Sequence, residues 1–274
     1  MTQNAQTPLS FDDLTLGYKS HPAVHHLSGA LRAGSLTAVV GANGSGKSTL
    51  LKGIVGLLKP ISGRTRIAPG LKIAYLPQQS GIDVSFPAQL RDLVGLGLWP
   101  KRGLLGRRRP EDEAAVSGAL RAVGLAGFER RSLDTLSGGQ LQRALFARVI
   151  LQEADLILLD EPFNAVDART IADLMSLILR WKDEGRTVLA VVHDLDLVRE
   201  RFPEALLLAR RLVAWGPARE TLKPENLLKA RRFHEAWDDA APWCAPEPEE
   251  ASPGAHVHGH GHSHDHAHDH RGAA

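Results

Sequence analysis

Residues 41–49 read GANGSGKST, and this stretch decides the fold because it fits the phosphate-binding pattern G-x-x-x-x-G-K-[ST]. The apolar, β-branched segment 35–40 (SLTAVV) predicts a strand before the loop, and residues 47–58 predict a helix after it. Backbone N–H groups in such a loop, together with the positive end of the following helix, bind phosphate. We expect phosphate contacts from Gly41, Asn43, Gly44, Gly46, Lys47, Ser48 and Thr49.

A nucleotide site built on this loop also needs a carboxylate at the end of a neighbouring strand. The apolar run at residues 156–159 ends in Asp160 and Glu161. Asp160 and the Ser48 hydroxyl are the expected Mg²⁺ ligands, and Lys47 is expected to bridge the β- and γ-phosphates. Glu161 is the expected general base for the water that attacks the γ-phosphate. Acidic residues after an apolar run also occur at helix N-caps, so the loop is what makes this pair significant.

The wider pattern predicts an α/β fold. A second apolar run at residues 187–192 (TVLAVV) follows an amphipathic helix, whose stripe at helical spacing is Ile171, Leu174, Met175, Ile178 and Leu179. Apolar runs that alternate with helices are typical of a parallel sheet covered on both faces. We therefore predict a P-loop NTPase core of mainly parallel sheet with helices on both faces. The mostly helical pattern between residues 78 and 154 indicates an inserted subdomain.

Composition limits the class of protein. The chain has 274 residues, with 33 Lys and Arg against 31 Asp and Glu, and its formal charge of +2 gives no reason to expect nucleic acid as a partner. Its single cysteine, Cys244, cannot form an intramolecular disulfide, and the N-terminal residues resemble no secretory signal, so we expect a reducing cytosol. The longest apolar runs are far shorter than the ~20 residues that span a bilayer.

A second motif identifies the family that the chain resembles. Residues 136–140 read LSGGQ, upstream of Asp160 and Glu161. A P-loop alone leaves kinases and small GTPases open, but this signature together with the downstream His193 resembles the ATP-binding-cassette (ABC) transporter ATPases. The resemblance implies ATP and Mg²⁺ as ligands, an N-terminal antiparallel β subdomain and a helical signature subdomain. We assign residues 8–222 to the ATPase domain (helical subdomain about 80–154), 223–244 to a C-terminal helix and linker, and 245–274 to a disordered tail.

The resemblance also implies a homodimer. In that family each nucleotide lies between the P-loop of one subunit and the signature loop of the other. The signature residues expected at the nucleotide are Ser137, Gly138, Gly139 and Gln140. They supply a hydroxyl and unhindered N–H groups ahead of a helix that we expect to start near Gln140, which makes a second anion site.

Four further residues take roles from the resemblance. Tyr18 would stack on adenine, although a strand tyrosine with its ring in the core is the alternative. Gln78 would contact Mg²⁺ or the attacking water and link to the membrane partner, with the neighbouring Gln79 leaving the register open. His193 would bond to the γ-phosphate, and Asp167 would couple the two sites across the dimer.

The branch of the family is indicated by residues 161–167, EPFNAVD, which place Ala165 where a glycine is usual and are similar to zinc and manganese uptake ATPases. This implies the ATPase subunit of a divalent-metal importer, with zinc first and manganese next. Its partners would be an integral membrane permease and an extracytoplasmic metal-binding protein, and its location the cytoplasmic face of the inner or plasma membrane. The alternatives are an importer of haem or siderophores and a soluble ABC ATPase of DNA repair, translation or cluster assembly.

The C-terminal segment carries a separate signal. Residues 256–270 read HVHGHGHSHDHAHDH, in which imidazoles alternate with small or acidic residues: His256, His258, His260, His262, His264, His266, His268 and His270. Imidazole nitrogen suits Zn²⁺, Cu²⁺ and Ni²⁺. We expect this tail to bind zinc and to buffer or sense the incoming metal, with low-complexity drift as the alternative.

Overall fold

The computed structural model describes residues 7–18, 21–78, 86–103 and 109–235. Within these ranges the strands form one nine-stranded sheet in the order β4-β1-β2-β9-β8-β3-β7-β6-β5. The strands are β1 (Leu9–Tyr18), β2 (His21–Leu31), β3 (Leu36–Val40), β4 (Ser62–Ile67), β5 (Ile73–Leu76), β6 (Leu156–Asp160), β7 (Thr187–Val191), β8 (Glu204–Ala209) and β9 (Arg211–Pro217).

The sheet has a parallel centre and an antiparallel N-terminal part. Strand β3 pairs in parallel with β7 and β8, and β6 pairs in parallel with β5 and β7. Strand β1 runs antiparallel to both β2 and β4, and β9 runs antiparallel to β8. The predicted fold class is therefore confirmed, including the antiparallel N-terminal subdomain. The predicted strands at 35–40 and 187–192 are each shortened by one residue.

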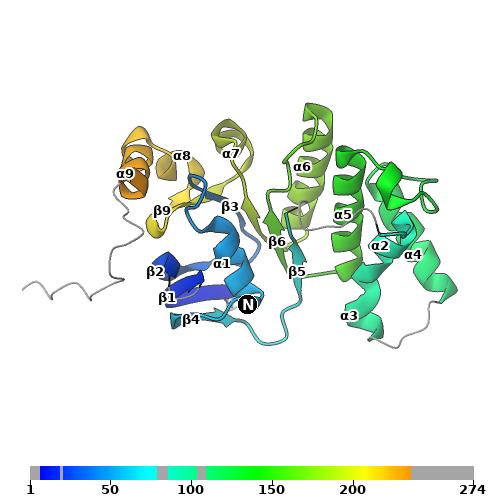
Figure 1. The fold of residues 1–274 in the computed structure, drawn as a ribbon, viewed down its shortest axis with the longest axis horizontal. Helices are drawn as coiled ribbons and strands as arrows, with labels where there is room; N and C mark the ends of the chain where they lie inside the picture. The colour runs from blue at the N-terminus through cyan, green and yellow to red at the C-terminus, as the bar shows by residue number, and fades with distance from the viewer. Residues whose placement is uncertain (1–6, 19–20, 79–85, 104–108, 236–274) are drawn as a thin grey trace, which may run out of the picture. The chain divides into compact units, whose positions relative to one another are not determined.

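Strand alternation divides the core between the two faces of the sheet. Leu36, Ala38 and Val40 of β3 face one cluster, which also contains α5 (Gly138–Gln152) and α6 (Ala168–Asp183). Val39 faces the other cluster, in which α1 (Lys47–Ile54) packs with strands β1 and β2. Figure 1 shows α1 beside these two strands and α5 and α6 beyond β6. Helices thus cover both faces, as the apolar runs predicted.

Between β5 and β6 the described chain is helical. It contains α2 (Leu90–Gly95), α3 (Trp99–Arg102), α4 (Pro110–Ala122) and α5, with short 3₁₀ turns at Leu96–Leu98 and Leu133–Thr135. One expectation is corrected here: α5 begins at Gly138, not near Gln140. The Ser137 hydroxyl accepts a hydrogen bond from the Gln140 N–H at 3.2 Å, and the Gln140 side chain accepts one from the Ser137 N–H at 3.1 Å. This capping box fixes the start of the helix.

The remaining helices lie in the C-terminal part of the described chain. They are α7 (Leu195–Arg201), α8 (Ala218–Thr221) and α9 (Pro224–Glu235), and Leu227 and Ala230 of α9 pack against the core. The end of the helix that we expected beyond Glu235, and the histidine-rich tail, lie outside the described residues. Where the chain is described, no helix is both long enough and apolar enough to span a bilayer.

Candidate functional site

The phosphate-binding loop lies between β3 and α1, and two of its glycines are required by their surroundings. A Cβ at Gly41 would lie 2.1 Å from the Leu208 carbonyl oxygen. A Cβ at Gly46, whose φ is +96°, would lie 2.3 Å from the Ala23 carbonyl oxygen. The loop therefore packs directly on backbone of β8 and β2, which only glycine permits.

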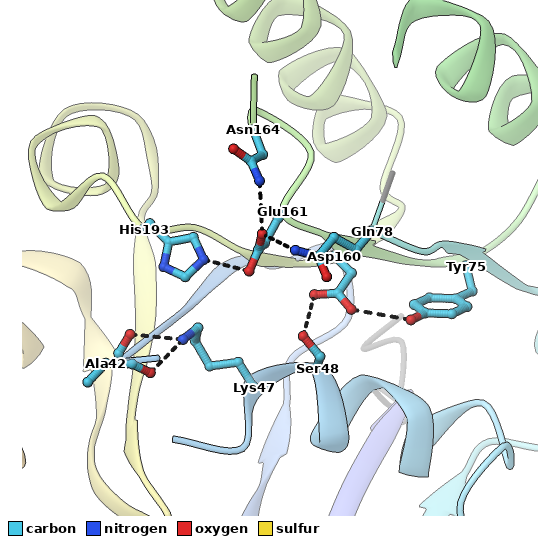
Figure 2. Close-up of polar contacts among 10 residues, drawn as sticks. Ala42, Lys47, Ser48, Tyr75, Gln78, Asp160, Glu161, Asn164 and His193 are labelled. Carbon is cyan, nitrogen blue, oxygen red and sulfur yellow. Dashed lines mark hydrogen bonds and ion pairs between the residues drawn. The ribbon is translucent and has the colours of Figure 1, made fainter. Parts of the chain in front are cut away.

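Lys47 is the charged side chain of this loop. It is 5% exposed, and its Nζ donates hydrogen bonds to the carbonyl oxygens of Gly41 at 2.9 Å and Ala42 at 2.8 Å. Burial lowers the pKa of Lys47, while the charges of Glu161 and Asp160 oppose that shift. The ammonium group thus lies over the loop and points at its two carbonyl oxygens (Figure 2).

Asp160 ends β6 and lies beside the first turn of α1. It is 2% exposed, its Oδ1 accepts from the Ser48 hydroxyl at 2.9 Å, and its Oδ2 accepts from the Tyr75 hydroxyl at 3.3 Å. Burial raises the pKa of Asp160, and the hydrogen bonds from Ser48 and Tyr75 act in the opposite direction. A carboxylate and a hydroxyl that converge in this way fit Mg²⁺, which prefers hard oxygen ligands and shares them with phosphate and water.

Glu161 follows Asp160 and is surrounded by side chains from three segments. Its Oε1 lies 2.6 Å from His193 Nε2, at the end of β7. Its Oε2 accepts from Gln78 Nε2 at 2.7 Å and from Asn164 Nδ2 at 3.3 Å. Glu161 itself has φ +52°, a left-handed backbone conformation that turns its side chain out of the direction of β6. Figure 2 shows His193, Gln78 and Asn164 converging on its carboxylate.

The structure thus brings together five residues that the sequence placed in one site with Glu161. Lys47 contacts the loop and Ser48 contacts Asp160. Gln78 and His193 contact Glu161. Gln78 contacts the expected general base and not Asp160. Because the neighbouring Gln79 lies outside the described residues, Gln78 is the glutamine whose placement is known.

The signature residues lie elsewhere in the chain. A Cβ added at Gly138 would lie 3.5 Å from the Ala165 carbonyl oxygen, and one at Gly139 would lie 3.7 Å from Thr170 Oγ1. Asp167 caps α6, since its Oδ1 accepts from the Thr170 N–H at 2.9 Å. The signature loop and Asp167 therefore lie side by side, next to the segment that leaves Glu161.

Tyr18 ends β1 and its side chain is at the surface. The residue is 48% exposed, which excludes the alternative that its ring packs in the core. An exposed ring is compatible with stacking on a base, so this role stays a prediction.

Two residues of the site were missed by reasoning from the sequence. Tyr75 lies inside an apolar strand, where nothing local points to Asp160. Asn164 lies in the EPFNAVD segment, but only the turn at Glu161 brings its amide back to that carboxylate. In neither case does the spacing along the chain carry a signal.

No cluster of three or more His, Cys, Asp or Glu side chains that could hold a metal ion occurs in the described part of the chain. The histidines from His256 to His270 fall outside that part, so the structure does not test the expected zinc site.

The glycine loop with its buried lysine is suited to phosphate, the hydroxyl and first carboxylate are suited to Mg²⁺, and a second carboxylate lies beside them. These features together define a P-loop nucleoside triphosphatase. The chain belongs to the ABC transporter family, whose model matches residues 24–164. It is accordingly an ABC ATPase, a class that uses ATP and Mg²⁺.

Known proteins resemble the chain over most of its length. It is 38% identical to the manganese transport system ATP-binding protein MntB of Listeria monocytogenes, over 80% of this chain and 94% of that protein. It is also 38% identical to the zinc transport system ATP-binding protein TroB of Treponema pallidum, over 80% of this chain and 85% of that protein. A solved inward-facing transporter assigned to the metal-chelate type superposes with a TM-score of 0.75 at 30% identity, covering 83% of this chain and 90% of that one.

Proposed function

We propose that this ATPase powers the import of a divalent metal ion, with zinc as the cargo. The proposal that the cargo is a divalent metal ion rests on the equal sequence identity, 38% in both cases, to a manganese and to a zinc transport ATPase. Those relatives do not separate the two metals. The eight alternating imidazoles favour zinc, because nitrogen ligands bind Zn²⁺ more tightly than Mn²⁺.

The proposed chemistry follows from the contacts around Glu161. Glu161 takes the proton of the attacking water, and Gln78 and Asn164 hold one of its oxygens while His193 holds the other. Lys47 and the loop N–H groups bind the phosphates, and Ser48 and Asp160 hold Mg²⁺. Bound Mg²⁺ neutralises charge on the phosphate oxygens. We also propose that Tyr18 stacks on adenine, consistent with its exposed ring.

We propose further that the working form is a homodimer. The signature loop, with Ser137, lies against Ala165 and Thr170 of its own chain, whereas the phosphate loop lies between β3 and α1. A second chain would bring its signature residues Ser137, Gly138, Gly139 and Gln140 to this loop, with Asp167 between the two sites.

Gel filtration of Glu161→Gln protein tests this arrangement. Blocked hydrolysis keeps ATP bound, so Mg²⁺ and ATP should give a dimer. Adding Ser137→Arg should leave ATP binding intact and yield a monomer. A double variant that still dimerises with ATP would contradict the composite site.

The expected membrane permease needs a surface on which to dock. A cavity of about 340 Å³ opens among α2, α3 and α4 and is lined by both signs of charge, including Arg91, Arg102, Asp112, Glu113, Glu129 and Arg130. We propose that the permease docks here, because α2 begins shortly after Gln78 and docking could reach the site through that glutamine. Arg91→Glu should leave the ATPase of the isolated chain unchanged and abolish transport.

Uptake assays test the cargo. The chain is reconstituted in vesicles with the permease and the extracytoplasmic binding protein of its system, and radioactive zinc and manganese uptake are compared with ATP inside. Zinc uptake should be the faster at equal metal concentration. Manganese uptake without zinc uptake, or uptake of haem or a siderophore alone, would contradict the proposal. No uptake at all by the assembled vesicles, with ATP hydrolysis intact, would favour a soluble ABC ATPase.

The histidine tail, residues 245–274, is proposed to bind zinc and to buffer or sense it. Deletion of residues 255–274 should leave ATP hydrolysis intact and change the zinc dependence of uptake. Unchanged uptake across a zinc titration would count against this role and would favour low-complexity drift.

A further inference from the structure

Tyr75 is a half-buried residue of β5 that touches the nucleotide site. Strand β5 pairs in parallel with β6, and Tyr75 is aligned with Leu158, two residues before Asp160. The Tyr75 hydroxyl donates to Asp160 Oδ2 at 3.3 Å. Figure 2 shows the ring lying across from Ser48, on the opposite side of the Asp160 carboxylate.

The two hydroxyls engage different oxygens of the same carboxylate. Ser48 bonds to Oδ1 at 2.9 Å and Tyr75 bonds to Oδ2 at 3.3 Å. The terminal torsion of an aspartate is broad and roughly two-fold, so a single hydrogen bond leaves the plane of the carboxylate free to turn. Two donors on opposite oxygens fix that plane.

We propose that Tyr75 is a positioning residue for Mg²⁺ binding: its hydroxyl holds Asp160 in the orientation in which that carboxylate and Ser48 take the ion together. The contact that the Tyr75 hydroxyl makes is with Asp160, a proposed Mg²⁺ ligand. Its effect is therefore on the Mg²⁺ concentration that the site needs, and ATP binding without Mg²⁺ should not depend on it. This inference rests on the nucleotide site and is independent of the transported cargo.

A purely structural role for Tyr75 predicts something different. Its ring packs against the apolar cluster that contains Leu156 and Leu158. If packing were its only role, phenylalanine would serve equally well. The Tyr75→Phe variant keeps the ring and removes only the hydroxyl, so it separates the two roles.

The first test measures binding of a non-hydrolysable ATP analogue as a function of Mg²⁺ concentration. Tyr75→Phe should raise the half-saturating Mg²⁺ concentration roughly fivefold to tenfold, which lies within the range for loss of one ordinary hydrogen bond. Its affinity for the analogue in the presence of a chelator should equal that of the unaltered protein. Ser176→Ala, which removes an exposed hydroxyl of α6 that donates within its own helix, should leave the Mg²⁺ dependence unchanged.

The second test reads the hydrogen bond directly, without nucleotide and without the Tyr75 substitution. The chain contains 2 tyrosines, so a carbon-13 label at Cζ of tyrosine gives one signal each, assigned with Tyr18→Phe. Asp160→Asn should shift the Tyr75 signal far more than that of Tyr18. A Tyr75 signal indifferent to Asp160→Asn, or a Tyr75→Phe protein with unaltered Mg²⁺ dependence, would overturn the proposal.

Discussion

Nε2 of His193 lies 2.6 Å from Oε1 of Glu161. The two residues follow β7 and β6, which are neighbouring parallel strands with Val191 aligned to Asp160. Parallel strands end at the same edge of a sheet, so the contact follows from the register of this pair. His193 contacts Oε1, whereas Gln78 and Asn164 both donate to Oε2. The expected general base is thus held at both oxygens, and its contact with His193 is the shortest of the three.

Replacing Glu161 by glutamine should remove hydrolysis and spare binding. The amide cannot accept the proton of water at neutral pH, so we expect phosphate release to fall by about 10²–10⁴-fold while ATP affinity is retained. Phosphate release and nucleotide binding are measured on the same preparation. Glu225→Gln, at an exposed carboxylate of α9, is the matched control and should hydrolyse ATP normally. A Glu161→Gln protein with normal turnover would refute the assignment.

Alanine substitutions at two glycines with positive φ distinguish the loss of stability caused by a steric clash from that caused by backbone strain. A Cβ added at Gly46 (φ +96°) would lie 2.3 Å from the Ala23 carbonyl oxygen, whereas one added at Gly56 (φ +77°) would have nothing within 4 Å. Gly56→Ala should lower the free energy of unfolding by about 1–2 kcal/mol through strain alone. Gly46→Ala adds a clash with backbone and should cost at least about 3 kcal/mol. Urea unfolding of both variants checks the order, and equal losses would contradict it.

Ala165 occupies a left-handed conformation, with φ +56°, a region that favours glycine. Relief of that strain exceeds the extra entropy of glycine in the unfolded chain, so Ala165→Gly should raise the free energy of unfolding by about 0.5–1 kcal/mol. Ala172→Gly, at an exposed position inside α6, should lower it by about 1 kcal/mol. Equilibrium unfolding in urea measures both, and a loss of stability in Ala165→Gly would contradict the argument.

The buried His25 should make stability depend on pH. Its side chain is fully buried, and burial, aided by the charge of Arg211, lowers its pKa from 6.5 to about 4. As the pH falls from about 6.5 towards 4, His25 therefore becomes protonated in the unfolded chain but stays neutral in the folded chain. In that window this group should remove up to about 1.4 kcal/mol of stability per pH unit.

The comparison that isolates this effect is His25→Gln. The other histidines are present in both proteins and cancel in the difference. Urea unfolding at several pH values should show the unaltered protein losing stability faster than the variant below about 6.5, and parallel curves above it. Parallel curves throughout would mean that His25 does not titrate in this way.

The sequence by itself determined the fold class and the main parts of the site, because these depend on short-range patterns. GANGSGKST between an apolar strand and a helix defines the phosphate loop wherever it occurs. The apolar run that ends in Asp160 and the one before His193 predict buried parallel strands. The structure places β7 between β3 and β6. The start of α5 was placed two residues too late, because Ser137, three residues before Gln140, caps the helix and makes Gly138 its first residue.

Only the tertiary structure decided which side chains meet. Asp160 is clamped between Ser48 and Tyr75, which lie 112 and 85 residues away along the chain, and no local pattern records such contacts. The left-handed turn at Glu161, which brings Asn164 back to its carboxylate, is likewise a consequence of backbone conformation. Motifs define the chemistry because a phosphate needs the same donors in every protein. Sheet order and strand register define the orientation of those donors, and both arise from packing across the whole chain.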